Sequence, residues 1–230
     1  MKAQRRFPPL RPSIALLAAL SWLSVWAGCP CPAGVHDDSR EYYLPYPFLS
    51  AFLVGQGNMG LGEICPACSH FGRYAIDFVM EQGTPVTAAR GGTVLGVRDT
   101  CPDVNCPWAG TETPECCGNY VTVTHDDQTT AQYWHLQPGG VLVAPGDPVQ
   151  RGDVLGLSGN TGISIMPHLH FAAKVPDGDT SCQSLGCPTG HGCGSGGCSQ
   201  NATTEAAFAD VCGSGVPELG WIYTSQNAPR

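Results

Sequence analysis

After residue 27 the chain has no apolar repeat of helical period that extends over ten residues, and this constrains its fold more than any other feature. Apolar residues instead alternate with small or polar ones, as at Val121 and Val123, which is the pattern of half-buried strands. The 230 residues also include 30 glycines and 20 prolines, which favour turns over helices. We therefore predict an all-β fold: an antiparallel sheet that carries a cleft on one face, with inserted loops as the walls of that cleft.

The alternation pattern defines the expected strands. They span residues 84–97, 119–125, 131–136, 149–157, 170–175, 206–211 and 220–224. An Asp-Asp-Gln turn at residues 126–128 joins two of them into a hairpin and places His135 on the return strand. By alternation Tyr133 shares a face with His135, so it either lines the same cleft or packs half-buried beside it.

Two histidines, His168 and His170, stand where another of these strands begins, between Pro167 and Phe171. Side chains two residues apart on a strand point to the same face, about 7 Å apart at their α-carbons. Both imidazoles therefore enter one cleft. A pair with this spacing also occurs as a structural or surface feature, so the pair alone does not define a metal site.

Three further residues, His70, Asp77 and His135, complete the candidate site. A catalytic zinc ion takes three protein ligands from histidine and carboxylate side chains and keeps one position open for water. One Zn²⁺ per chain would be held by His70, Asp77 and one histidine of the pair. His135 and the other histidine would then serve as acid, base or oxyanion-binding groups. No His-Glu-x-x-His sequence is present, so a metal site on a helix is not expected.

The sequence around these residues resembles that of the lysostaphin-type zinc endopeptidases, from about residue 46 to about residue 175. The segments that carry the resemblance are Ser69–Phe78, Gly83–Val94, Tyr133–Leu136, Gly159–Gly162 and His168–Phe171. The resemblance implies zinc ligands at His70, Asp77 and His170. It also implies that His135 and His168 line the cleft, help to activate the zinc-bound water and stabilise the tetrahedral intermediate.

Two details of the motif concern its surroundings. Asn160, in the Gly159–Gly162 loop, is a further candidate to line the cleft. The chain places six residues between His70 and Asp77, more than is usual in that family. This departure changes the expected backbone next to the first ligand.

The resemblance implies an exported endopeptidase that hydrolyses peptide bonds in the cross-links or stems of peptidoglycan. An alternative is a non-catalytic relative that binds the cell wall through the same groove and regulates other wall hydrolases; the presence of all five site residues argues against it. A third reading is a carrier module, because residues 145–156 resemble the hairpins of lipoyl-type domains. Those domains carry a lysine at a hairpin tip, whereas no lysine lies between Lys2 and Lys174.

The charge of the chain argues against nucleic acid as a partner. The net charge is −8, and only 13% of the residues are charged. Binding to phosphates needs clustered lysines and arginines, which this chain lacks.

Residues 1–27 are predicted to be a signal peptide, because basic residues precede an apolar run at residues 14–26. The run is shorter than the roughly 20 residues that span a membrane. Small residues precede a cleavage point after Ala27. Cys29 permits a second reading, in which the chain is a lipoprotein and meets the membrane only through a lipid on this residue; otherwise one thiol is free or paired between chains.

Thirteen cysteines in an exported chain indicate disulfides. Most of them cluster: Cys101, Cys106, Cys116 and Cys117 fall in one loop, and Cys182, Cys187, Cys193 and Cys198 fall in another. We expect pairing within each cluster, so that the insertions are closed locally. Cys65 and Cys68, with His70, form a less favoured candidate for a structural zinc site, which needs four ligands.

The expected organisation has three parts. A signal peptide (1–27) and a flexible segment (28–41) precede one peptidase domain (42–230), which contains a glycine- and cysteine-rich insertion at residues 176–200. We expect an extracytoplasmic monomer, either secreted or retained in the periplasm or cell envelope.

Overall fold

The computed structural model of the chain describes residues 41–58, 74–104, 106, 114–175, 192–194, 197–199 and 203–229. Several predictions fall outside these residues. They concern the signal peptide, Cys29, nearly all of the 28–41 segment, Cys65, Cys68, His70 and most of the 176–200 insertion.

Strands dominate the described residues, which contain one short 3₁₀ turn (η4, Pro114–Cys116) and no α-helix. The strands are β1 (Ala51–Gln56), β2 (Ile76–Val79), β3 (Pro85–Thr87), β4 (Gly92–Arg98), β5 (Asn119–Thr124), β6 (Thr130–Val141), β7 (Pro148–Val149), β8 (Val154–Ser158), β9 (His168–Lys174), β10 (Gly192–Gly194), β11 (Gly197–Ser199), β12 (Thr203–Thr204) and β13 (Ile222–Thr224). The prediction of an all-β antiparallel fold is confirmed. The described residues contain no helix that is long and apolar enough to cross a membrane.

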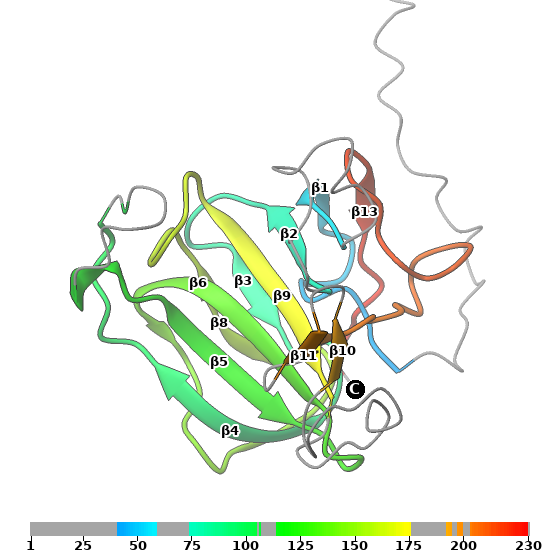
Figure 1. Ribbon diagram of the computed structural model, residues 1–230, viewed down its shortest axis with the longest axis horizontal. Coiled ribbons are helices and arrows are strands. Elements are labelled where there is room, and N and C mark those ends of the chain that lie inside the picture. Colours follow the sequence, from blue (N-terminus) through cyan, green and yellow to red (C-terminus); the bar gives the residue numbers. More distant parts are fainter. Residues whose placement is uncertain are drawn as a thin grey trace, which may run out of the picture.

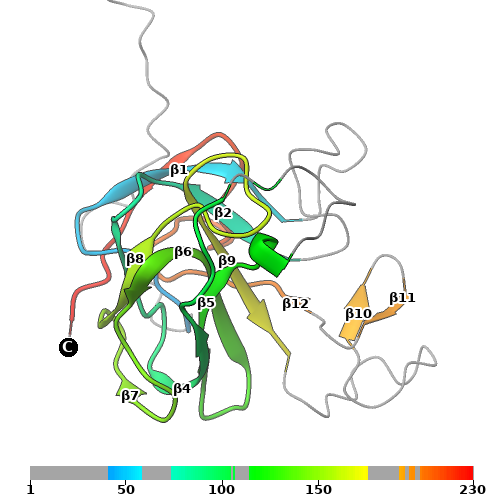
Figure 2. The same ribbon diagram turned by 90° about the vertical axis from the view of Figure 1, so that its left-hand side faces the viewer.

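One large sheet organises the molecule, with strand order β13-β1-β2-β9-β6-β5-β4-β7. Figure 1 shows β9, in yellow, between β2 and β6 at the centre of this sheet. β12 pairs with β9, while β8 pairs with both β3 and β6, and every strand pair is antiparallel. β10 and β11 form a separate hairpin that stands clear of the large sheet (Figure 2).

Two expected strands are interrupted by turns. The segment 84–97 divides into β3 and β4, and 149–157 divides into β7 and β8 around Gly152, which has φ +87°. A left-handed residue of this kind ends regular pairing, and glycine adopts it without steric cost. The segment 206–211 is not a strand, so that expectation was wrong. Its backbone makes only isolated bonds, such as the one from the N–H of Ala209 to the carbonyl of Tyr42, and an isolated bridge between Phe208 and Tyr42. The Asp210 carboxylate adds hydrogen bonds from the backbone N–H groups of Leu44 and Gln226.

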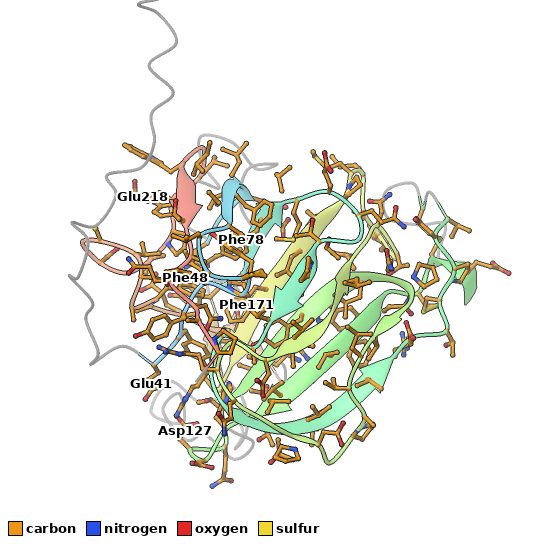
Figure 3. The ribbon with its side chains drawn as sticks, turned by 180° about the vertical axis from the view of Figure 1, so that it is seen from behind. Glu41, Phe48, Phe78, Asp127, Phe171 and Glu218 are labelled. Carbon is orange, nitrogen blue, oxygen red and sulfur yellow. A yellow bond between two sulfur atoms is a disulfide. The ribbon has the colours of Figure 1, made fainter. Side chains whose placement is uncertain are left out.

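An aromatic core covers one face of β2 and β9. In both strands side chains alternate, so Ile76, Phe78, Leu169 and Phe171 are buried in the core while their neighbours face the other way. Figure 3 shows Phe78 and Phe171, both labelled, among the clustered side chains behind these strands. The core lies behind β2 and β9, which leaves their opposite face for the site.

A β-bulge in β6 breaks the alternation that the sequence suggested. Leu136 pairs with Asn119 and Trp134 pairs with Tyr120, so His135 is the extra residue, with φ +66°. Tyr133 therefore lies on the core face, where it is fully buried and its hydroxyl accepts a hydrogen bond of 2.9 Å from the backbone N–H of Ala89. The expectation that Tyr133 lines the cleft was wrong, and its alternative, a packing role, is correct except that Tyr133 is fully buried instead of half-buried.

Two nested disulfides close the loop between β4 and β5. Cys101 pairs with Cys117, and Cys106 pairs with Cys116. Pairing within this cluster was predicted and is confirmed. The other cysteine-rich loop lies largely outside the described residues, and Cys212 is also disulfide-bonded.

We expect the substitution Tyr133→Phe to lower the free energy of unfolding by about 1–3 kcal/mol, because it leaves the buried N–H of Ala89 without an acceptor. Denaturant unfolding of the oxidised protein measures this. Tyr120→Phe is the matched control, because the Tyr120 hydroxyl has no hydrogen-bond partner in the described part of the chain. Equal unfolding free energies for the two variants would show that the buried hydrogen bond contributes nothing.

Candidate active site

The register between β2 and β9 brings the carboxylate and two histidines of the site together. Asp77 pairs with His170 across the two strands, and His168 lies two residues away on the same face. The Asp77 Oδ1 atom lies 2.9 Å from His170 Nδ1, and Asp77 Oδ2 lies 3.6 Å from His168 Nε2. One carboxylate therefore contacts both imidazoles from the neighbouring strand.

The bulge in β6 brings His135 to the same place. Trp134 pairs with His170, and the extra residue turns the His135 ring to the face that Trp134 occupies instead of the core face. The His135 ring centroid lies 4.5 Å from that of His168 and 5.8 Å from that of His170. A positive φ at a non-glycine residue costs on the order of 1 kcal/mol, so this position is maintained by its surroundings.

The backbone carbonyl of Thr161 fixes the proton on His135. His135 Nδ1 lies 2.7 Å from this oxygen, and because a carbonyl can only accept, Nδ1 carries the hydrogen. Burial, together with the neighbouring His168 and His170, lowers the pKa of His135 to about 3. The ring is thus neutral near pH 7, with a lone pair on Nε2 that can accept a proton.

His168 is held in the same tautomer by a different part of the same loop. Its Nδ1 lies 2.8 Å from the carbonyl oxygen of Met166 and 3.1 Å from the hydroxyl oxygen of Ser164. That hydroxyl in turn lies 2.7 Å from Asn160 Oδ1, to which it donates. Asn160 is half-buried and takes part in this chain of hydrogen bonds, but it is not among the residues that line the groove.

A groove with a volume of about 450 Å³ runs along β6 and β9 beside these side chains. Its lining residues are Ala75, Cys116, Gly118, Gln132, Trp134, His135, Gly162, Ile163, His170, Ala172, Lys174 and Thr203. Gln132 and Trp134 occupy the face that alternation had assigned to Tyr133. The sequence analysis missed them because only the bulge reveals which face of β6 forms the floor.

Four of the five predicted site residues lie together: Asp77, His135, His168 and His170. His70 lies outside the described residues, so its place in the site stays a prediction. No group of three histidine, cysteine or acidic side chains in the described residues is arranged to hold a metal ion. Asp77 and His170 are the two predicted zinc ligands that the structure describes, and their role as ligands stays a prediction.

The comparison with protein families matches residues 72–181 to the family described as peptidase family M23. The chain contains an M23 peptidase domain. The matched segment includes the four clustered residues of the site and begins two positions after His70.

Two relatives show how the M23 domain compares with known proteins. It is 40% identical over 99 residues to peptidoglycan DD-endopeptidase ShyA from Vibrio cholerae, covering 43% of this chain and 19% of ShyA. It is 36% identical over 103 residues to lysostaphin from Staphylococcus simulans, covering 44% of this chain and 18% of lysostaphin. The chain thus spans only about a fifth of the length of either relative.

Among solved structures, the match to the catalytic domain of lysostaphin from Staphylococcus simulans covers 58% of this chain and 85% of the lysostaphin domain, with 27% identity and a TM-score of 0.38. This TM-score is too low to support the fold, which is therefore described from its strands and their register alone.

We expect Gly162→Ala to disturb the M23 domain more than Gly139→Ala. Both glycines have positive φ, +81° and +66°, so alanine at either position costs on the order of 1 kcal/mol of unfolding free energy. A Cβ at Gly162 would lie 2.9 Å from the α-carbon of Gly118, whereas a Cβ at Gly139 would meet nothing within 4 Å. The clash should cost about 1–3 kcal/mol more and shift the loop that orients both histidines.

Denaturant unfolding and peptidase turnover measure the two variants side by side. The expected result is a loss of both stability and turnover in Gly162→Ala, with turnover retained in Gly139→Ala. Indistinguishable variants would show that the contact between the Gly118 and Gly162 loops is not tight.

Proposed function

We propose that this chain is a zinc-dependent endopeptidase that hydrolyses peptide bonds in the cross-links or stems of peptidoglycan. The observation that carries the proposal is the approach of Asp77 Oδ1 to His170 Nδ1, 2.9 Å apart, beside two further imidazoles that are not needed as ligands. Asp77 and His170 can then bind the metal, while His135 and His168 remain free to transfer protons.

The donor atoms fit a zinc site. Ligands at zinc–oxygen and zinc–nitrogen distances of about 2.0–2.2 Å lie about 3.3 Å apart in a tetrahedron, close to the observed separation of Asp77 Oδ1 and His170 Nδ1. We assign His70 as the third ligand. A zinc ion bound there would polarise the scissile carbonyl and lower the pKa of a bound water to about 7.

His135 and His168 are the proposed catalytic residues. Both carry hydrogen on Nδ1, which leaves Nε2 able to take a proton from the attacking water. Once protonated, the same nitrogen can donate to the oxyanion or pass its proton to the leaving amine. The two roles need two imidazoles on one face, which His135 and His168 provide at a centroid distance of 4.5 Å.

The groove supports a peptide as the substrate. Its volume of about 450 Å³ falls in the range of ligand-binding clefts, and it follows the strands β6 and β9, along which an extended peptide can lie. Relatives of the M23 domain include proteins named peptidoglycan DD-endopeptidase and glycyl-glycine endopeptidase. Those names support peptidoglycan as the substrate and leave two types of scissile bond to be compared.

Peptidoglycan lies outside the cytoplasmic membrane, so the proposal includes export. Residues 1–27 supply the signal peptide, and the disulfides at Cys101–Cys117 and Cys106–Cys116 suit an oxidising compartment. The intact mass of the exported chain tests this. We expect an N-terminus at Gly28, or a lipid-modified Cys29, and recovery of only the uncleaved chain would contradict the assignment of the signal peptide.

For the purified oxidised protein we expect about one zinc per chain by metal analysis, in line with the site of three ligands. We also expect chelator-sensitive clearing of a peptidoglycan suspension. Asp77→Ala and His170→Ala should lose zinc and activity, whereas His135→Ala and His168→Ala should keep zinc and lose turnover by about 10²-fold or more. Product analysis on D-alanyl and on glycyl cross-links then identifies the bond.

Asp126→Ala is the matched control, because it removes an exposed aspartate from the β5–β6 turn and should change neither zinc content nor clearing. Full zinc occupancy in Asp77→Ala would refute the ligand assignment. A wild-type protein that has neither zinc nor clearing activity would instead favour the non-catalytic, wall-binding regulator.

A further inference from the structure

A fully buried asparagine, Asn119, links the disulfide-closed loop to the active-site loop. Its Oδ1 accepts a hydrogen bond of 2.9 Å from the backbone N–H of Cys101, and its Nδ2 donates one of 3.0 Å to the carbonyl of the same residue. Cys101 is itself bonded to Cys117. The side chain of Asn119 thus completes a reciprocal pair with the cysteine that closes the loop.

The backbone of Asn119 makes the next connection. Its N–H donates to the hydroxyl oxygen of Thr161 at 2.9 Å, and that hydroxyl donates to the carbonyl of Leu136 at 2.7 Å. Thr161 is fully buried, and its own carbonyl is the group that accepts from His135 Nδ1. Leu136 directly follows the bulged His135 and pairs with Asn119 across β5 and β6.

These contacts surround the strained residue. His135 has a positive φ, and the hydroxyl of Thr161 binds the carbonyl of the next residue while the carbonyl of Thr161 binds the imidazole. The loops also touch directly, since a Cβ on Gly162 would meet the α-carbon of Gly118 at 2.9 Å. The side-chain polar atoms of Asn119 and Thr161 all have hydrogen-bond partners, so loss of one bond leaves a buried group unsatisfied.

We propose that Asn119 and Thr161 are positioning residues for His135, and that through them the Cys101–Cys117 disulfide sets the geometry of the active site. The inference rests on the proposed peptidase function only for its kinetic readout. Without the path, the bulge loses the contacts that offset its strain, and His135 samples other ring orientations and tautomers.

The test compares Thr161→Val with Thr161→Ser in the zinc-loaded, oxidised protein. Valine matches the shape of threonine but lacks the hydroxyl, whereas serine keeps it. We expect Thr161→Val to lower kcat roughly 10- to 100-fold, with KM and zinc content unchanged, because a misplaced catalytic group costs rate and not binding. Thr161→Ser should stay within about threefold of wild type in kcat.

A second readout does not need activity. The nitrogen chemical shifts of the His135 ring report which nitrogen carries the proton. Wild type and Thr161→Ser should show hydrogen on Nδ1, and Thr161→Val should show the other tautomer or a mixture. Equal ring shifts in all three proteins, or equal kcat for valine and serine, would overturn the inference. If wild type cleaves nothing, the proposed function fails, and the ring shifts still decide the positioning role.

The disulfide supplies a variant that leaves Asn119 and Thr161 intact. The double substitution Cys101→Ser with Cys117→Ser should lower kcat and perturb the His135 ring shifts in the same direction as Thr161→Val. If Thr161→Val does not fold, the double cysteine variant replaces it in the test. Adding Thr161→Val to the double cysteine variant should lower kcat little further, because both changes act on one path. Full additivity of the two losses would contradict the coupling.

Discussion

The antiparallel register of β9 between β2 and β6 is the constraint on which the site depends. On one side it sets Asp77 opposite His170, and on the other it sets Trp134 opposite His170. A slip of one residue would exchange the two faces of β9, turning Phe171 toward solvent and His170 into the core. The aromatic core therefore stabilises the fold and also selects the register that brings carboxylate and imidazoles together.

The bulge in β6 places the His135 ring on the groove face, which a regular strand could not do. Alternation would direct His135 into the core beside Tyr133, whereas the structure places its ring 4.5 Å from that of His168, where the proposed chemistry needs it. One extra residue changes the face at a cost on the order of 1 kcal/mol, and the strain is confined to one position. Strain at a functional residue persists only where neighbouring contacts over-determine it, which gives the loop around Thr161 its structural purpose.

The sequence carried the all-β class and the shared face of His168 and His170, because a period of two residues along a strand is a local property. Asp77 was assigned to the same site from zinc chemistry and the family resemblance, because no strand was predicted around it and its pairing with His170 is a non-local register. It could not place Tyr133, since the residues of β6 give no sign of which one is bulged. It also could not identify Thr161 and Met166 as partners of the histidines, because they act through backbone carbonyls, which every residue possesses. Segment 206–211 failed as a strand because its backbone makes an isolated bridge to Tyr42 and no continuous ladder, while the side chain of Asp210 makes further hydrogen bonds to Leu44 and Gln226.

Backbone carbonyls orient His135 and His168, so the loop at residues 160–166 must keep its backbone conformation, whereas its outward-facing side chains can change. Residues 160–166 hold two imidazoles mainly by backbone shape, so an outward-facing side chain such as Ile163, which is 48% exposed and lines the groove, can vary without moving His135 or His168. In the described part of the chain, no α-helix packs against the loop at residues 160–166 to stabilise its shape. A disulfide-closed neighbour joined by buried hydrogen bonds can supply that rigidity from outside the sheet, so an insertion beside the groove can influence catalysis through the position of His135, in addition to any contact of its own with the substrate.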